Sequence, residues 1–484
     1  MIIPLAGYAP DVDPTTPGIV TNCSQFIPSL KGFEGAPSPM GIGISALAAA
    51  CQGSAFIRKL DDTTRVFAGT GTKLYELQSS SWTDRSHGTA YALGADIRWS
   101  FTQFGNVTIA AAKTETTQSS TTGSFADISG SPKATIVETV GQFVFAMDYN
   151  NGSEFQNGWY CCAKGDYTNW TPSVANECAT GTLTSSPGPI KAGKRFGESI
   201  IAYKKRSMYL GVYVGIPAIW DFREIPGSAG ALGQYVVVDI GTPEDPKHIF
   251  MGEDDFYQFD GARPIKIGTP LSKTVFQEIN QTYAHLSIAM HDQANSRVYF
   301  YYCGSSNTTL DKCVVYNYKT GKWGRADRTI EMAIQYIGTG VTYGGLGSLY
   351  TTYADFPDLS YGTAFLASSS PTPAVFDTAH TLKLLTGPTV TSSFTTGDYG
   401  DDQQMSCLSR VKARFITKPA SGLMTNYYKN SSGDSYTTDA ATALDSSSRF
   451  DVLREARWHK VMIETTGPME ISAIGADFIQ GGTE

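Results

Sequence analysis

Three groups of carboxylates are the side chains in this sequence best suited to chemistry. They are Asp61 with Asp62, the run Glu253–Asp255, and Asp398 with Asp401 and Asp402. Glycoside hydrolysis needs two carboxyl groups that converge in a pocket, and Asp254 and Asp255 with the neighbouring tyrosines are the best candidates for it. All three groups, however, lie in turn-like segments between apolar runs. We therefore expect surface turns, with a carbohydrate-binding or carbohydrate-cleaving site as the alternative.

The remaining polar motifs do not predict a catalytic site. His285 and His291 are six residues apart, which places them on one face of a strand but too far apart to share a metal ion. Gly69-Thr-Gly71-Thr-Lys73 lacks the spacing of a phosphate-binding loop and leads into an apolar strand, so it predicts a hairpin turn. No GxSxG or HExxH motif occurs. We expect no catalytic residue, no metal ligand, no cofactor-binding residue and no enzyme activity.

The densest basic run is Lys204-Lys205-Arg206. It lies between two apolar strands, where a solvated turn is the usual structure. The alternative is a contact with a partner protein or with a DNA phosphate. All three residues are therefore candidates for an interface or phosphate contact.

The eight cysteines are scattered and show no CxxC spacing of a zinc or redox site. A chain of 484 residues can bury a large core and needs no disulfides for stability. We expect reduced, buried thiols. Cys303 and Cys313 flank a polar loop, so a disulfide across that hairpin is the one pairing left open.

The composition indicates an all-β protein. Tyr, Phe, Val, Thr, Gly and Ser are abundant, and short apolar runs alternate with turn residues. The net charge of −8 offers no overall attraction to a phosphate backbone. The N-terminus lacks the pattern of a signal peptide, and no stretch of about 18 apolar residues predicts a membrane-spanning helix.

The same short pattern recurs along the chain: an apolar strand, a turn, a second strand, and a polar turn that carries an aromatic residue. These aromatic residues are Trp82, Phe125, Trp170, Trp220 and Trp323. The first four are separated by 43, 45 and 50 residues, and the segment around Tyr257 supplies one more unit before Trp323. A repeat of about 40 to 50 residues is typical of propeller blades. We therefore predict an irregular six-bladed β-propeller.

Three domains follow from this pattern. Residues 1–45 contain seven prolines and predict an extended N-terminal arm that is neither a helix nor a central strand. Residues 46–385 form the propeller, with a short helical insertion near 271–280 and closing strands after residue 330. Residues 386–484 have longer alternating strands and predict a C-terminal β-sandwich.

With this layout, the chain resembles the tail nozzle, or packaged-DNA stabilisation, proteins of short-tailed bacteriophages. The resemblance covers nearly the whole chain and rests on the order of its parts and on four phrases: Arg65–Leu77, Asp254–Gly268, Trp458–Glu464 and Gly467–Ser472. The family has no catalytic motif, so no functional residue can be transferred to this sequence. The resemblance implies a structural virion protein that forms a ring below the portal and adaptor, retains packaged DNA and conducts it during ejection.

The implied partners are other copies of the chain in a six-fold ring, the portal or adaptor protein, tail needle and tail fibre or spike proteins, and passing DNA without sequence-specific binding. A channel for sliding DNA should have a polar to acidic wall, because each cation that neutralises a phosphate adds affinity. Two loops, 182–189 and 343–347, are candidate channel gates, because Gly and Ser residues allow a loop to move. They contain Thr182, Ser185 and Gly188 in the first loop, and Gly344, Gly345 and Gly347 in the second.

Overall fold

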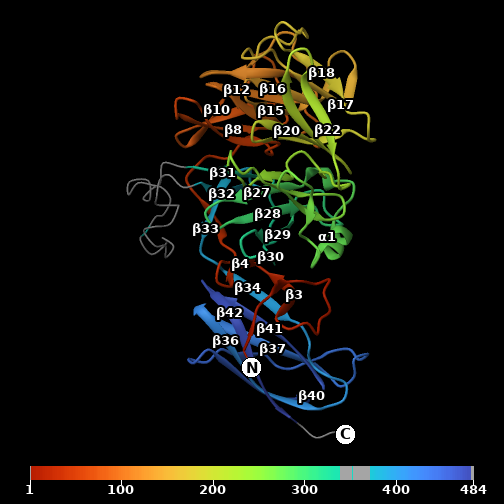
Figure 1. Ribbon diagram of the computed structural model, residues 1–484. Coiled ribbons are helices and arrows are strands. Elements are labelled where there is room, and N and C mark those ends of the chain that lie inside the picture. The colour runs from red at the N-terminus through yellow and green to blue at the C-terminus, as the bar shows by residue number, and fades with distance from the viewer. Residues whose placement is uncertain (1, 338–351, 353–370, 481–484) are drawn as a thin grey trace.

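The computed structural model describes residues 2–337, 352 and 371–480 (Figure 1). Nearly all regular structure is β-strand, which confirms the all-β prediction. The predicted helical insertion is confirmed as the short helix α1 (Ser272–Glu278), and a 3₁₀ turn η1 (Ala284–Leu286) follows it. Among the described residues, no helix has the length and apolar character needed to cross a membrane.

Four sheets are separate four-stranded blades. The first is made of β7 (Ser54–Arg58), β8 (Thr64–Gly69), β9 (Leu74–Gln78) and β10 (Ser81–Asp84). The second is made of β19 (Ile190–Phe196), β20 (Ser199–Lys204), β21 (Met208–Gly215) and β22 (Ile219–Ile225). The third is made of β23 (Val237–Asp239), β24 (His248–Met251), β25 (Phe256–Phe259) and β26 (Ile265–Lys266). The fourth is made of β31 (Met332–Tyr336), β32 (Thr372–Phe376), β33 (Leu382–Gly387) and β6 (Ser38–Gly41).

Larger sheets contain the other repeat units. One eight-stranded sheet joins β11 (Ser100–Phe104), β12 (Val107–Ala112), β13 (Glu115–Ser120) and β14 (Ala126–Asp127) to β15 (Lys133–Val140), β16 (Phe143–Asn150), β17 (Glu154–Cys161) and β18 (Ala179–Thr182). The two halves of this sheet are linked by a single residue pair, Thr116 with Lys133. A further unit consists of β27 (Ile288–Asp292), β28 (Arg297–Tyr302), β29 (Lys312–Asn317) and β30 (Lys322–Arg325).

The first strands of these units are neighbours in a closed ring. Contacts run from β7 through β11, β15, β19, β23, β27 and β31, and back to β7. The arrangement is therefore propeller-like, but the predicted count of six blades is wrong: four blades are separate sheets, and the remaining units belong to larger sheets. The count failed because pairing of β13 with β15 and of β30 with β4 merges predicted units into larger sheets. In addition, the last blade takes its fourth strand, β6, from the N-terminal arm.

The strands of the N-terminal arm are paired with strands from other parts of the chain. Its strands are β1 (Ile2–Pro4), β2 (Gly7–Tyr8), β3 (Ile19–Ser24), β4 (Phe26–Pro28), β5 (Phe33–Gly35) and β6. Strand β3 lies between β2 and β34 (Thr391–Thr396), so the arm does supply a central strand. It can do so because residues 19–24 contain no proline and keep their backbone N–H donors.

The C-terminal strands contribute to two sheets at the lower end of the molecule in Figure 1. One contains β42 (Glu470–Gln480), β36 (Ser406–Thr417) and β40 (Arg449–Ala456), with β1 paired to β42. The other contains β34, β41 (Trp458–Thr466), β37 (Ser421–Lys429) and β38 (Thr437–Thr438), with β35 (Tyr399–Gly400) and β39 (Thr442–Ala443) at its edges. A separate β-sandwich stays a prediction, since the first sheet continues through β5 and β4 into the β27–β30 unit.

Candidate functional site

The carboxylates singled out from the sequence are occupied by structural contacts. Asp255 is buried, and its Oδ1 accepts hydrogen bonds from Phe256 N, Gly268 N and Ser272 Oγ, so it fixes the turn before α1. Its expected place in a surface turn is wrong. Asp254 accepts hydrogen bonds from Tyr257 Oη at 2.6 Å and Lys266 Nζ at 2.9 Å. Burial alone would raise the pKa of Asp254, but these two donors lower it, so its carboxylate stays ionised.

In the other two acidic groups, Asp61 and Asp401 make turn contacts, as expected, whereas the Asp398 side chain is only 10% exposed and pairs with Lys460 at 3.0 Å. Asp61 Oδ1 accepts hydrogen bonds from the backbone N–H and the hydroxyl of Thr63. Asp401 Oδ1 accepts from the backbone N–H groups of Gln403 and Gln404. Such Asx-type contacts satisfy donors of the turn itself.

The basic run is divided between the core and the surface. Lys204 at the end of β20 is fully buried, and its Nζ lies 2.6 Å from the carbonyl oxygens of both Leu183 and Ser186. Burial lowers its pKa. The assignment of Lys204 to a phosphate or partner contact is therefore wrong. Lys205 and Arg206 are exposed and both pair with Glu253.

Replacing Lys204 with methionine should lower the free energy of unfolding by about 1–3 kcal/mol, because two buried carbonyls lose their donor. Lys205→Met is the matched control, and its exposed ion pair predicts a change within about 0.5 kcal/mol. Urea unfolding followed by tryptophan fluorescence measures both values. Equal effects of the two substitutions would contradict the structural role of Lys204.

The first candidate gate loop, residues 182–189, is held by polar contacts. Thr182 in β18 is paired with Gly158 in β17. Ser186 Oγ lies 2.6 Å from Ser207 Oγ and 2.7 Å from Tyr209 Oη. Ser185 lies between these two anchors, and Gly188 lies between Ser186 and β19. The second loop, with Gly344, Gly345 and Gly347, lies outside the described residues. Both assignments as gates stay predictions.

The histidines and cysteines have structural surroundings. His285 belongs to η1, whereas His291 belongs to β27 and lies 3.1 Å from Tyr318 Oη, so the two do not share a strand. Cys303 and Cys313 are buried free thiols, so the disulfide that the sequence left open is not formed in this structure.

His248 is a buried histidine whose hydrogen bonds fix its tautomer. Its Nε2–H donates to the Arg195 carbonyl at 2.8 Å, which leaves Nδ1 to accept from Tyr203 Oη at 2.6 Å. Burial lowers the pKa of His248 from its ordinary value of 6.5 to about 4. The native ring is therefore neutral at neutral pH.

The burial of the neutral His248 ring predicts that acid destabilises the native protein. Between pH 6.5 and 4 the unfolded chain binds a proton at His248 that the native state does not, so the free energy of unfolding falls as the pH falls through this window. The total loss should be about 3 kcal/mol. Denaturant titrations at several pH values test this, and His248→Gln should flatten the pH dependence in the window. An unchanged slope in the variant would show that other groups cause it.

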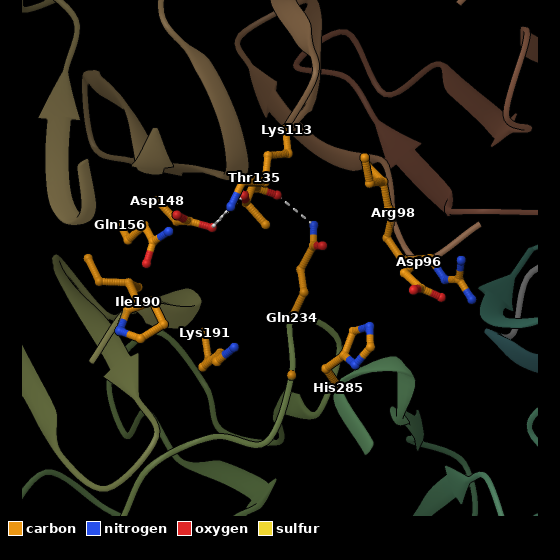
Figure 2. Close-up of a pocket in the computed structure, with 13 residues that line it drawn as sticks. Asp96, Arg98, Lys113, Thr135, Asp148, Gln156, Ile190, Lys191, Gln234 and His285 are labelled. Atoms are coloured by element: carbon orange, nitrogen blue, oxygen red, sulfur yellow. Dashed lines mark hydrogen bonds and ion pairs between the residues drawn. The ribbon is translucent and has the colours of Figure 1, made fainter. Parts of the chain in front are cut away.

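The best candidate for a binding site is a pocket whose residues come from different units of the ring. This pocket of about 280 Å³ lies at one end of the inner strands (Figure 2). Its polar lining comes from the segment before β11, the loop after β12, the strands β15, β16, β17 and β19, and the segments before β23 and β27. These lining residues are Asp96, Arg98, Lys113, Thr135, Asp148, Gln156, Lys191, Gln234 and His285.

The backbone at Asp148 is shaped to present its carboxylate. A register irregularity between Met147 and Tyr149 interrupts β16, and Asp148 has a φ of 47°. Its Oδ2 accepts a hydrogen bond from Thr135 Oγ1 at 2.6 Å and lies 3.7 Å from Lys113 Nζ. Burial raises the pKa of Asp148 above its ordinary value, although Thr135 and Lys113 oppose this shift.

Sequence reasoning missed this pocket entirely. Asp148 and Lys191 lie in separate repeat units, and neither belongs to a recognisable motif. The pattern that could have indicated the pocket is the position of its residues in the repeat: several of them lie at the start of an inner strand. A propeller-like ring brings successive units together at these positions.

No protein-family model matches the chain, and no curated protein matches it. Among solved structures, it is similar to "YCF48 bound to D1 peptide", with a TM-score of 0.34 and 12% identity, over 62% of this chain and 86% of that chain. It is also similar to an exo-beta-1,3-galactanase from Phanerochaete chrysosporium, with a TM-score of 0.29 and 9% identity, over 91% and 100% of the two chains. A puromycin hydrolase matches with a TM-score of 0.34 and 11% identity, over 71% and 60%. Similarities at this level carry no argument about function.

Proposed function

We propose that this chain is a structural subunit of a short-tailed phage virion, a tail nozzle that forms a ring below the portal and adaptor. In this role it retains packaged DNA and conducts it during ejection. The proposal begins from the layout of arm, repeat units and terminal strands, which resembles that family of tail proteins.

The observation that carries the proposal is the continuous sheet between the repeat units and the C-terminal strands. The order β30-β4-β5-β42 joins the two parts by backbone hydrogen bonds, because the N-terminal arm supplies β4 and β5. A flexible linker would let the two parts move independently. A joint built from paired strands instead suits a subunit that must stay fixed under the pressure of packaged DNA.

The charge of the chain is consistent with a conduit for DNA. A net charge of −8 gives no overall electrostatic attraction to the duplex, and Lys204, part of the densest basic run, is buried. Within the described residues, the acidic groups first considered for glycoside cleavage are occupied by turn, tyrosine and lysine contacts.

Cryo-electron microscopy of the virus particle, combined with mass spectrometry of its proteins, tests the proposal. We expect a ring of this chain below the portal and adaptor, with the C-terminal strands and the arm facing the adaptor. Particles that lack the chain would overturn the proposal. Tight, salt-sensitive binding of duplex DNA by the purified ring would overturn the predicted acidic channel wall, and assays for glycosidase, lyase and phosphoesterase activity should be negative.

A further inference from the structure

The pocket in Figure 2 has a lining that the nozzle function does not explain. It lies at one end of the ring of inner strands, and each wall is contributed by a different repeat unit. Lys113, Thr135 and Asp148 lie on one side of the open space, and Lys191 and His285 lie on the opposite side (Figure 2). Polar groups from so many units converge here without pairing fully with one another.

The cations of the lining are incompletely paired. Lys191 is only partly exposed and its charge favours the ionised form of Asp148, but its Nζ forms no hydrogen bond or ion pair within the described part of the chain. Arg98 donates from Nη1 to the Ala95 carbonyl at 2.8 Å, whereas its buried Nε has no partner among the described residues. With Lys113, the lining contains three permanent cations and two carboxylates, Asp96 and Asp148, so its charge favours one negative charge on a ligand.

The lining also presents free acceptors. Asp148 uses Oδ2 for Thr135 and Lys113, and no partner of its Oδ1 occurs among the described residues. Gln234 Nε2 donates a hydrogen bond to the Thr135 carbonyl at 2.8 Å, so its Oε1 remains available to accept a hydrogen bond from a ligand. His285 Nδ1 lies 3.1 Å from the Thr282 carbonyl and must be the donor, which leaves a lone pair on Nε2 of the neutral ring. Burial lowers the pKa of His285 and so favours that neutral ring.

Such a set of acceptors favours a ligand with several hydrogen-bond donors, and the hydroxyl groups of a sugar supply them. A polyphosphate has none and would place several negative charges beside Asp96 and Asp148, which disfavours it. The cavity of about 280 Å³ is slightly smaller than the ~300 Å³ at which pockets for drug-sized ligands begin. The size therefore fits one sugar-sized ring.

We propose that this pocket binds a monosaccharide acid, with its carboxylate at Lys191 and its hydroxyl groups donated to Asp148, Gln234 and His285. The ligand class is a hexuronate or the uronic acid at the end of an acidic glycan. The proposal does not rest on the nozzle function, because it is argued only from the lining residues of this chain.

Isothermal titration calorimetry of the full chain tests the proposal with D-glucuronate and D-galacturonate. The matched neutral sugars are D-glucose and D-galactose, which differ by a hydroxymethyl group in place of the carboxylate. At least one uronate should bind about tenfold or more tightly than its neutral partner, because a charge-assisted contact is lost in the neutral sugar. Inorganic phosphate should compete weakly, since it satisfies the cations but few of the acceptors.

Two variants locate the site. Lys191→Gln should weaken uronate binding by about tenfold. Lys194→Gln is the matched control on the same strand β19, because Lys194 pairs with Glu138 and is not part of the lining, and it should change binding by less than about twofold. Asp148→Asn should also weaken binding, through the hydroxyl contacts.

Several results would overturn the proposal. They are absence of binding for both uronates, equal binding of a uronate and its neutral partner, and phosphate competition at equal concentration. An unchanged affinity of Lys191→Gln, or equal losses in the Lys191 and Lys194 variants, would likewise place the ligand elsewhere. None of these results bears on whether the chain belongs to a phage tail, so the two proposals fail separately.

Discussion

Replacing Phe26 with alanine should lower the free energy of unfolding by about 3–5 kcal/mol, the range for a large aromatic side chain removed from a core. Phe26 in β4 is fully buried. Its ring stacks on Phe33 at 4.8 Å and on Phe394 at 4.6 Å between ring centroids. It therefore packs the N-terminal arm against the C-terminal strands at the point where β4 pairs with β30. The loss should appear both in urea unfolding and as faster proteolysis of the arm.

Leu30→Ala is the matched control for this substitution. Leu30 lies in the same arm, four residues further on, but is 60% exposed. Its removal should change the free energy of unfolding by no more than about 0.5 kcal/mol. If the Phe26 variant were as stable as the Leu30 variant, the arm would not connect the two parts of the molecule as the structure indicates.

Replacing Glu76 with glutamine should cost about 3–5 kcal/mol, because it leaves a buried cation without its counter-charge. Glu76 in β9 forms a two-point contact with Arg65, from Nε at 2.5 Å and Nη2 at 3.1 Å, and also accepts from Arg85 Nε at 2.7 Å. The Arg65 side chain is only 5% exposed and also donates to Ser120 in β13. The pair therefore joins two neighbouring units of the ring, and the substitution weakens both.

Glu198→Gln is the control, since Glu198 forms an ion pair with Arg195 but its side chain is 87% exposed. An exposed pair of this kind contributes about 0–1 kcal/mol. Thermal unfolding in low and high salt separates the two cases, because salt screens the exposed pair and has little effect on the buried one. A Glu76 variant within about 1 kcal/mol of the parent chain would show that water reaches Arg65.

Much of the fold could be predicted because it depends on local pattern. The short alternating strands and turn residues predicted an all-β chain, and the apolar face shared by Leu271, Val275 and Ile279 predicted the helix later found at Ser272–Glu278. The aromatic residues mark real unit ends: Trp220 packs on Phe145 and Trp323 on Phe256, each with ring centroids 4.8 Å apart. The alternation of apolar side chains and the residues that favour a turn depend only on neighbouring positions, so a single sequence reveals both.

The buried charges could not be predicted in the same way. A lysine in a basic run and an aspartate in an acidic run are both predicted to lie in solvated turns, yet Lys204 and Asp255 are buried. Lys204 is stabilised by the carbonyls of Leu183 and Ser186, and Asp255 by donors as distant in sequence as Ser272. Whether a charge can be buried depends on partners that the fold brings to it, and local composition does not reveal them.

The sequence by itself therefore determined the strand content, the repeat length, the helix and the absence of a familiar catalytic motif. Only the tertiary structure decided the number of separate blades, the pairing of β6 with β33, and the pocket that brings Asp148 near Lys191. The physical reason is sequence separation. Ring closure pairs residues about 340 positions apart, and the pocket gathers single residues from many units, so neither leaves a local periodicity to detect.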